Sequence, residues 1–180
     1  MKISKEQIFP TLLRKFEFNK DEMAPLLQEV TDNKEQIKQT SSFYSVNHYD
    51  NYYTDFQNPT KLREYEILMN MVAAQFTSSN YEFTVGEYWT AIYGKNSAHN
   101  THNHRSLNFN FSSILYLTNG GSTSLISSNS TAEINEHFEM AEVGKLIIFP
   151  STLWHYVTYQ DNNERMIISS NIRIAGNEYL

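Results

Sequence analysis

The second half of the chain is a succession of short apolar segments separated by turns. β-branched and aromatic residues dominate these segments, which favours strands over helices. Asn119-Gly120-Gly121 is a typical hairpin break between two of them. Many short strands that follow two helices predict a β-sandwich or jelly roll with the helices packed on one sheet. The segments expected to form strands are residues 81–93, 109–117, 123–126, 145–149, 155–157 and 166–174.

The first 80 residues are predicted to be mainly helical. Apolar residues recur at helical spacing from Met23 to Val30 behind a capping Asn19, which predicts a helix over residues 20–31. The other expected elements are an edge strand at residues 8–13, a polar loop at 33–50, and a second helix from Asn58-Pro59-Thr60 to about Phe76. We expect one domain over residues 1–180, with N-terminal helical support over about 1–80 and a β-rich core over about 81–175.

Composition excludes several classes of site and partner. The net charge of −6 argues against nucleic acid as a partner, because nucleic-acid binders normally carry a basic face. Without cysteine there is no disulfide, no zinc–thiolate site and no cysteine nucleophile. The sequence shows neither a signal-peptide core nor an apolar run near the length of a membrane span. We therefore expect a cytoplasmic protein (in the host cytoplasm if phage-encoded) without a membrane partner.

Three of the six histidines lie within six residues, from His99 to His104. His102 and His104 project to the same side of an extended segment, because strand side chains alternate with period two. Imidazole is the side chain that most often binds transition metals, so this pair predicts part of a metal site. His155 follows a distant apolar run, and Arg165 comes ten residues later. These four residues are the candidate site, whereas His99 is expected beside it or on the surface.

Each candidate also has a simpler interpretation. His102 and His104 occur in a polar stretch rich in Asn and Ser, which is typical of a surface loop. His155 can be a strand-end histidine that packs under a neighbouring tryptophan. Arg165 follows the polar run 161–164, as an exposed hairpin residue would.

The motifs around these residues resemble those of the 2-oxoglutarate/Fe(II)-dependent dioxygenases, most closely a prolyl-hydroxylase-like subgroup common in phages and bacteria. The resemblance covers about residues 88–171 and implies a double-stranded β-helix, a jelly roll of the cupin-like kind. It rests on Trp89, His102-Asn103-His104, Ser112-Ser113-Ile114-Leu115-Tyr116-Leu117, Phe149-Pro150-Ser151-Thr152-Leu153-Trp154-His155, Arg165 and Asn171.

The resemblance also implies roles for individual residues. Fe(II) would be held by His102, His104 and His155, which leaves the opposite positions for 2-oxoglutarate and dioxygen. Arg165 would bind the distal carboxylate of 2-oxoglutarate, since a guanidinium offers a directed fork of donors. Tyr93, Tyr116 and Ser169 match further cosubstrate-binding positions of the family.

The sequence departs from the family pattern at four positions. His104 stands where a carboxylate ligand is usual, and Arg105, Ser113 and Ile167 replace a proline, a glycine and a serine. Three neutral imidazoles leave more net positive charge on the ion than two imidazoles and a carboxylate would. This favours binding of an anionic cosubstrate but weakens retention of the metal. Other carboxylates, at residues 133, 136, 139, 142 and 161, are possible substitutes outside the motif.

The resemblance implies a dioxygenase that couples 2-oxoglutarate decarboxylation to hydroxylation of an unknown protein, peptide or small-molecule substrate, such as a prolyl residue. An alternative is a non-catalytic, cupin-like module that binds metal or has a structural role. A third is a three-histidine zinc hydrolase, in which Arg165 would have no evident role.

Overall fold

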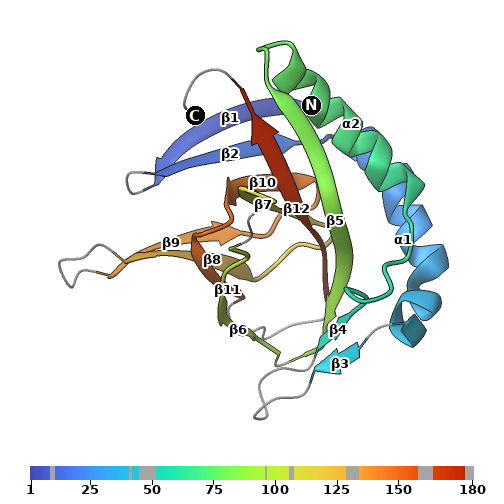
Figure 1. Cartoon of the computed structure of the whole chain (residues 1–180). Coiled ribbons are helices and arrows are strands. Elements are labelled where there is room, and N and C mark those ends of the chain that lie inside the picture. The colour runs from blue at the N-terminus through green and yellow to red at the C-terminus, as the bar shows by residue number, and fades with distance from the viewer. Residues whose placement is uncertain are drawn as a thin grey trace.

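The computed structural model describes residues 1–8, 11–40, 42–44, 52–95, 97–105, 108–128, 134–157 and 164–176. Figure 1 shows its strands as two sheets, with both helices along one side of the larger sheet. The elements are β1 (Lys2–Ile8), β2 (Thr11–Glu17), α1 (Lys20–Thr40), β3 (Ser42–Tyr44), β4 (Tyr52–Thr54), α2 (Arg63–Thr77), β5 (Glu82–Tyr93), β6 (His99–His102), β7 (Phe111–Tyr116), β8 (Ser122–Ser128), β9 (Ile134–Met140), β10 (Lys145–Pro150), β11 (Trp154–Val157) and β12 (Arg165–Ala175).

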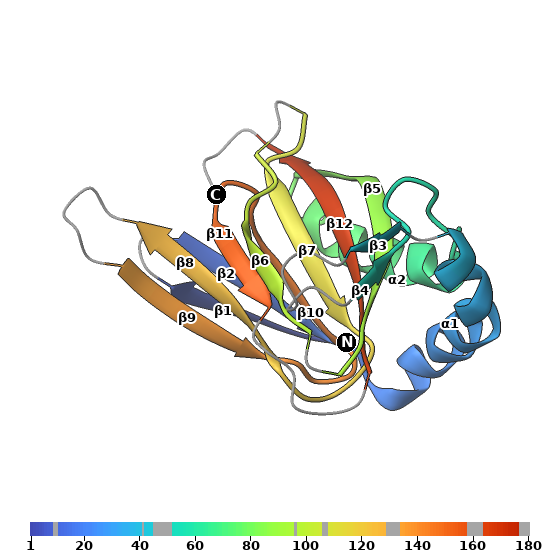
Figure 2. The same cartoon turned by 90° about the horizontal axis from the view of Figure 1, so that it is seen from below.

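From β5 onward the chain passes repeatedly between the two sheets, with β8 and β9 as consecutive strands of the smaller one. The eight-stranded sheet has the order β1-β2-β10-β7-β12-β5-β4-β3, and the four-stranded sheet has the order β6-β11-β8-β9. Every strand pairing in the described part of the chain is antiparallel. Figure 2 shows the smaller sheet in front of β7, β10 and β12. This winding is a double-stranded β-helix, so the predicted fold is confirmed.

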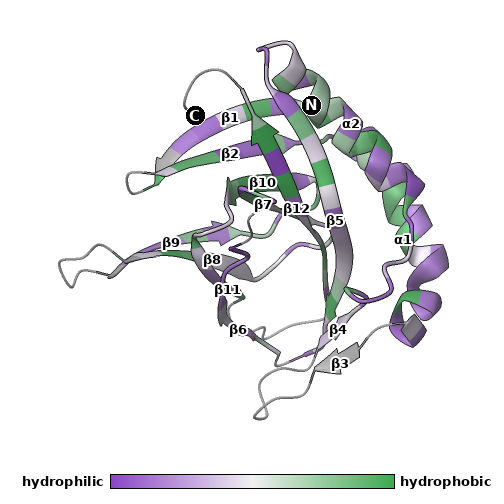
Figure 3. Ribbon diagram, in the orientation of Figure 1, coloured by the Kyte–Doolittle hydropathy of each residue, from purple (hydrophilic) through white to green (hydrophobic). Residues whose placement is uncertain are grey.

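Alternation along the strands creates two buried layers. On β12, Ile168, Ile172 and Ile174 pack in the layer that contains α1 and α2. Ile167, next to Ile168, belongs to the second layer, between the sheets, together with Tyr116 of β7. Figure 3 shows hydrophobic and hydrophilic residues side by side on both helices, as expected for helices that cover one face of a sheet.

Helix α1 is longer than predicted. Asn19 caps it through two backbone amides, as expected, and the Glu22 carboxylate accepts a hydrogen bond from the Asn19 amide. The helix continues to Thr40 and β3 covers residues 42–44, so the expected loop over residues 33–50 is wrong for 33–40 and 42–44. Residues 41 and 45–50 lie outside the described part of the chain. Ile37, seven residues after Val30, is fully buried and anchors the additional turns of the helix to the core. Residues 31–36 between them are polar, so the sequence shows no apolar periodicity there.

Helix α2 begins at Arg63, a few residues later than predicted. It has no capping side chain of its own at Leu62. Instead, the Glu29 carboxylate of α1 accepts hydrogen bonds from the amides of Arg63 and Glu64 at 2.8 and 2.9 Å. The N-terminus of α2 is therefore set by a neighbouring helix, which local sequence does not reveal.

The six predicted strands all form, but several others were not predicted. The expected edge strand at residues 8–13 is a hairpin of β1 and β2, and β3, β4, β6 and β9 are additional strands. These strands are short or polar and lie near sheet edges, where a strand does not need alternating apolar residues. Neither helix in the described residues combines the length and apolar character that crossing a membrane requires.

Adjacent apolar residues on α2 provide a test of the helix–sheet layer. Leu68 is 4% exposed, whereas Ile67 is 41% exposed. We expect Leu68→Ala to lower the free energy of unfolding by about 2–5 kcal/mol, because it leaves a cavity in the core. Ile67→Ala should change it by about 0.5 kcal/mol or less. Urea denaturation followed by circular dichroism measures both; equal losses would contradict this packing.

Candidate metal centre

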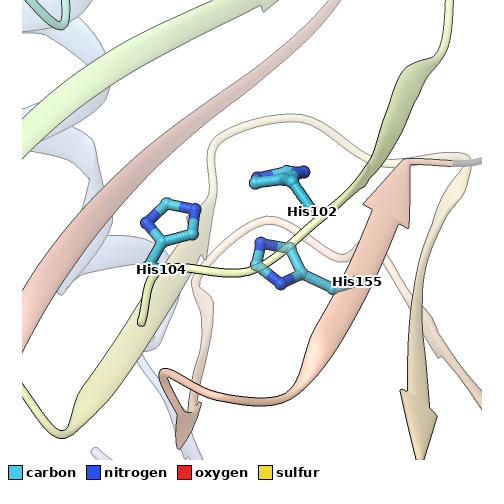
Figure 4. Close-up of side chains that lie close together, drawn as sticks. All are labelled: His102, His104 and His155. Carbon is cyan, nitrogen blue, oxygen red and sulfur yellow. The ribbon is translucent and has the colours of Figure 1, made fainter. Parts of the chain in front are cut away.

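Three imidazoles converge from the small sheet, as Figure 4 shows. His102 ends β6, His104 lies two residues later, and His155 lies on β11 directly opposite His102 in the antiparallel register. One potential ligand nitrogen from each ring lies within 4.8 Å of the others. The His104 amide donates to the Ser151 carbonyl at 2.9 Å, which ties the segment after β6 to the turn before β11. The surface-loop interpretation of these residues is therefore wrong.

Each of these imidazoles directs its Nδ1 atom at a protein oxygen. The acceptors are the Asn100 carbonyl for His102 (2.8 Å), the Asn171 side-chain oxygen for His104 (3.2 Å) and the Leu153 carbonyl for His155 (3.2 Å). Because a carbonyl oxygen only accepts, each ring carries its proton on Nδ1 and keeps the lone pair on Nε2. This is the arrangement in which histidines bind a metal through Nε2.

Burial keeps the three imidazoles neutral. It lowers the pKa of His104 to about 4, with a further contribution from His102. Burial likewise lowers the pKa of His102 and, to well below its ordinary value, that of His155. Neutral imidazole is the form that binds metals, so no proton has to be displaced near pH 7.

His99 lies beside the centre, as expected, and is not one of the three clustered ligand atoms. Its two ring nitrogens hydrogen-bond the hydroxyls of Tyr52 (3.1 Å) and Tyr93 (3.2 Å), and its ring stacks on His102 with centroids 4.1 Å apart. Burial lowers its pKa to about 3, helped by the neighbouring imidazoles. His99 thus supports His102 from the side.

A cavity of about 530 Å³ opens in front of the imidazoles. This volume is typical of a small-molecule site. Trp89 stacks almost parallel on His104, at 5.4 Å and 9°, and Phe56 meets Trp89 edge-on. The cavity is lined by the three imidazoles, His99, Tyr52, Thr54, Phe56, Glu87, Trp89, Ala91, Tyr93, Asn103, Arg105, Asn108, Phe109, Ile114, Val157, Ile167, Ser169 and Asn171.

Arg165 is buried behind this cavity, at 1% exposure, which rules out the exposed-hairpin interpretation. Its guanidinium donates to the Ser122 carbonyl (2.9 Å) and the Thr123 hydroxyl (3.0 Å). In the described part of the chain its Nε has no hydrogen-bond partner, and no carboxylate forms an ion pair with it. Burial lowers the pKa of Arg165, but a guanidinium stays charged near pH 7. Among the described residues, this buried cation therefore has no anionic partner.

Two of the other predicted residues, Tyr93 and Tyr116, lie against this guanidinium. Its central carbon lies 5.8 Å from the ring centre of Tyr93 and 5.4 Å from that of Tyr116. The Tyr116 hydroxyl donates to Thr123 at 3.0 Å. Tyr93 and Ser169 line the cavity, whereas Arg165 and Tyr116 do not. The guanidinium thus lies one layer of side chains below the cavity surface.

The described carboxylates considered as substitutes for an acidic ligand lie elsewhere. Glu139 is held by Lys15 (2.8 Å) and Lys145 (3.0 Å), and those lysines help to lower its pKa despite burial. Glu142 also pairs with Lys145, and Glu136 accepts a hydrogen bond from a tyrosine hydroxyl. Residues 133 and 161 lie outside the described part of the chain.

One acidic residue that sequence reasoning missed does line the cavity. Glu87 of β5 accepts a hydrogen bond from the Asn171 amide at 3.2 Å. The only sequence signal was Gly86, because a glycine inside a strand pattern indicates a bulge or close approach. A Cβ built at this position would meet the Phe109 ring at 2.0 Å, so Gly86 is needed for Phe109 to pack there.

Solved structures share this architecture, although no family model and no curated protein matches the sequence. A Pseudomonas putida prolyl-4-hydroxylase aligns with a TM-score of 0.66 at 17% identity, over 89% of this chain and 91% of that one. A Trichoplax adhaerens prolyl hydroxylase, solved with a hypoxia inducible factor peptide, aligns with a TM-score of 0.67 at 14% identity, over 88% of this chain and 82% of that one.

A third structure comes from outside the prolyl hydroxylases. The epimerase SnoN, in complex with Fe3+, alpha ketoglutarate and nogalamycin RO, gives a TM-score of 0.68 at 9% identity, over 92% of this chain and 81% of that one. The chain has the fold of the 2-oxoglutarate/Fe(II) oxygenases. At these identities the likeness concerns the fold, and the site has to be argued from its own residues.

The lowered imidazole pKa values predict how the metal-free protein responds to acid. The pKa of His104 is about 4 when folded and 6.5 ordinarily, so below pH 6.5 the unfolded chain binds a proton that the folded chain does not. Stability should therefore fall as pH decreases from 6.5 towards 4. Each such histidine contributes a slope of up to about 1.4 kcal/mol per pH unit.

Chemical denaturation in the presence of chelator, between pH 7 and 5, measures this slope. His104→Asn should flatten this slope by about the contribution of one histidine. A wild-type stability that stays constant over this range would show that the imidazoles are not held neutral by burial.

Proposed function

We propose that this protein is a 2-oxoglutarate- and Fe(II)-dependent dioxygenase that hydroxylates an organic substrate. The observation that carries the proposal is the combination, within one β-helix, of three neutral imidazoles at a cavity and, beneath it, a buried guanidinium that pairs with none of the described carboxylates. A metal site alone would fit a hydrolase or a binding module equally well. The unpaired cation adds a specific requirement for an anionic ligand in the same place.

The donor set fits a divalent transition metal. His102, His104 and His155 would hold Fe(II) through Nε2, because their Nδ1 atoms are committed to protein oxygens. Three ligands leave positions free for a chelating cosubstrate and dioxygen. The bound ion would supply the coupling of 2-oxoglutarate decarboxylation by dioxygen to oxidation of the second substrate. Because all three ligands are neutral, they would cancel none of the positive charge of the bound Fe(II), and that charge would attract an anion.

Arg165 would bind the distal carboxylate of 2-oxoglutarate. Burying a charge without a partner is costly, and the two neutral acceptors at Ser122 and Thr123 offset only part of that cost. The Nε–H remains available for a carboxylate. Tyr93 and Ser169, at the cavity surface above it, and Tyr116, beside it, would align and desolvate the cosubstrate.

For the second substrate we propose a peptide or protein side chain, such as a prolyl residue. Two of the proteins that share the fold are prolyl hydroxylases, and one of them was solved with a peptide. The aromatic wall of Phe56, Trp89 and Phe109 suits a small apolar side chain. SnoN, which was solved with nogalamycin RO, makes a small molecule the alternative to test.

A ligand variant tests the metal site. We expect His155→Ala to lose bound Fe(II) under anaerobic conditions and to abolish formation of succinate from 2-oxoglutarate. Tyr156→Phe, next to His155 on β11 but outside the cavity lining, is the control and should leave both unchanged. In the wild type, anaerobic Fe(II) and 2-oxoglutarate together should give a weak visible absorption band that neither gives alone. Iron binding without that band would favour the non-catalytic module.

A second variant tests the anion site. Arg165→Leu should weaken 2-oxoglutarate binding by roughly 30- to 1,000-fold, as expected for loss of one partner of a buried charge pair. Fe(II) affinity should not change, because Arg165 does not contact the imidazoles. Arg173→Leu removes an exposed arginine from the same strand and serves as the control. Unaltered 2-oxoglutarate affinity in Arg165→Leu would refute this role.

A further inference from the structure

We infer that Asn171 and Glu87 are positioning residues that form a hydrogen-bonded chain behind His104, orient its imidazole and place a negative charge behind it. The inference rests on the proposed metal site and extends it to two cavity-lining residues that are not among the three clustered ligands. The chain runs from the His104 Nδ1–H to the Asn171 side-chain oxygen at 3.2 Å, and from the Asn171 amide nitrogen to the Glu87 carboxylate at 3.2 Å.

The three imidazoles are supported in different ways. His102 and His155 each bond the carbonyl oxygen two residues earlier in their own segment. These bonds are built into the local backbone and do not depend on any distant side chain. His104 instead depends on the side chain of Asn171, 67 residues away on β12. Its orientation can therefore be changed by substitution without altering the other two.

The Glu87 carboxylate fixes which way the Asn171 amide points. A carboxylate accepts hydrogen bonds and cannot donate, so it selects the Asn171 NH₂ group and turns the carbonyl oxygen towards His104. That oxygen in turn selects the Nδ1–H form of the imidazole. Trp89 stacks on the ring and limits its rotation. One carboxylate thus determines the position of a proton two side chains away.

A β-bulge brings Glu87 to this position. Ser170 of β12 pairs with Tyr88 of β5, and Ile172 pairs with Val85. Only Asn171 lies between the two residues on β12, whereas Gly86 and Glu87 both lie between their partners on β5. The extra residue reverses the alternation of β5. Phe83 and Val85 pack against the helical layer, whereas Glu87 and Trp89 line the cavity. Bulges often re-aim side chains next to active sites in this way.

The chain also has an electrostatic role. His104 occupies the position at which the family pattern has a carboxylate ligand. Glu87, polarising His104 through the Asn171 amide, raises the basicity of Nε2 and supplies negative charge from behind the ligand. Glu87 thereby supplies part of the negative charge that a carboxylate ligand would have provided, and it does so without occupying a coordination position.

Substitutions that break or rebuild the chain test this inference. Asn171→Leu, similar in size to the amide, and Glu87→Gln, which removes only the charge, should each weaken Fe(II) or Co(II) binding, the former by about 10- to 100-fold. Anaerobic metal titration of the full chain measures the affinity. Glu82→Gln, at the start of the same strand, is the control and should bind as the wild type does.

The double variant N171D/E87Q separates positioning from simple disturbance of the fold. In it the donor and the acceptor exchange places, because the new glutamine amide can donate to the new aspartate, which still accepts from His104. We expect this variant to recover most of the affinity lost in Glu87→Gln. N171D alone places two carboxylates together and should bind less tightly than the double variant.

Nitrogen-15 NMR of the metal-free protein gives a second measurement that is independent of activity. In the wild type all three imidazoles should carry the proton on Nδ1. In Asn171→Leu only His104 should shift towards the Nε2–H form, whereas His102 and His155 should not. Unchanged metal affinity and unchanged tautomers in both single variants would overturn the inference while the proposed function stood. A wild-type protein that binds no metal would overturn the proposed function.

Discussion

The pairing of β12 with both β5 and β7 is the constraint on which the site depends. Because strand side chains alternate, the same eleven residues supply a hydrophobic face to the helices and a functional face to the cavity. A slip of one residue would exchange the two faces and bury Arg165 among isoleucines. The packing of Ile168, Ile172 and Ile174 against the helical layer prevents that slip. The register that gives the core is therefore also the register that places Arg165 and Asn171.

The strands that bury apolar residues were predictable from sequence, and the edges were not. Strands such as β7 and β10 are almost fully buried and show in composition alone. By contrast, β1 and β9 are polar, because an edge or solvent-facing strand gains little from apolar side chains. The start of α2 was missed for a related reason, since its capping carboxylate belongs to α1. Tertiary partners decide such boundaries.

The residues of the candidate site likewise fall into those that the sequence predicted and those that it did not. His102, His104, His155 and Arg165 were identified from spacing and resemblance, and the structure brings the three imidazoles together with the guanidinium beneath their cavity. Glu87 was missed because its place follows from a bulge, and a bulge depends on the register of two strands. No local pattern distinguishes a glutamate at a bulge from a glutamate elsewhere on a strand. Residues that act through another side chain are for this reason harder to find than residues that act directly.

The charges in the site explain how a chain with a net charge of −6 can attract an anion. All the described imidazoles around the cavity are held neutral by burial, so the permanent positive charge beneath it belongs to Arg165. A bound divalent metal would add charge at the opposite end of a cosubstrate. A dianion that bridges the two would place one carboxylate at each positive centre, whereas a monoanion would leave one of these centres without an anion. The distribution of charge thus favours a ligand with two carboxylates, and it does so independently of any likeness in sequence.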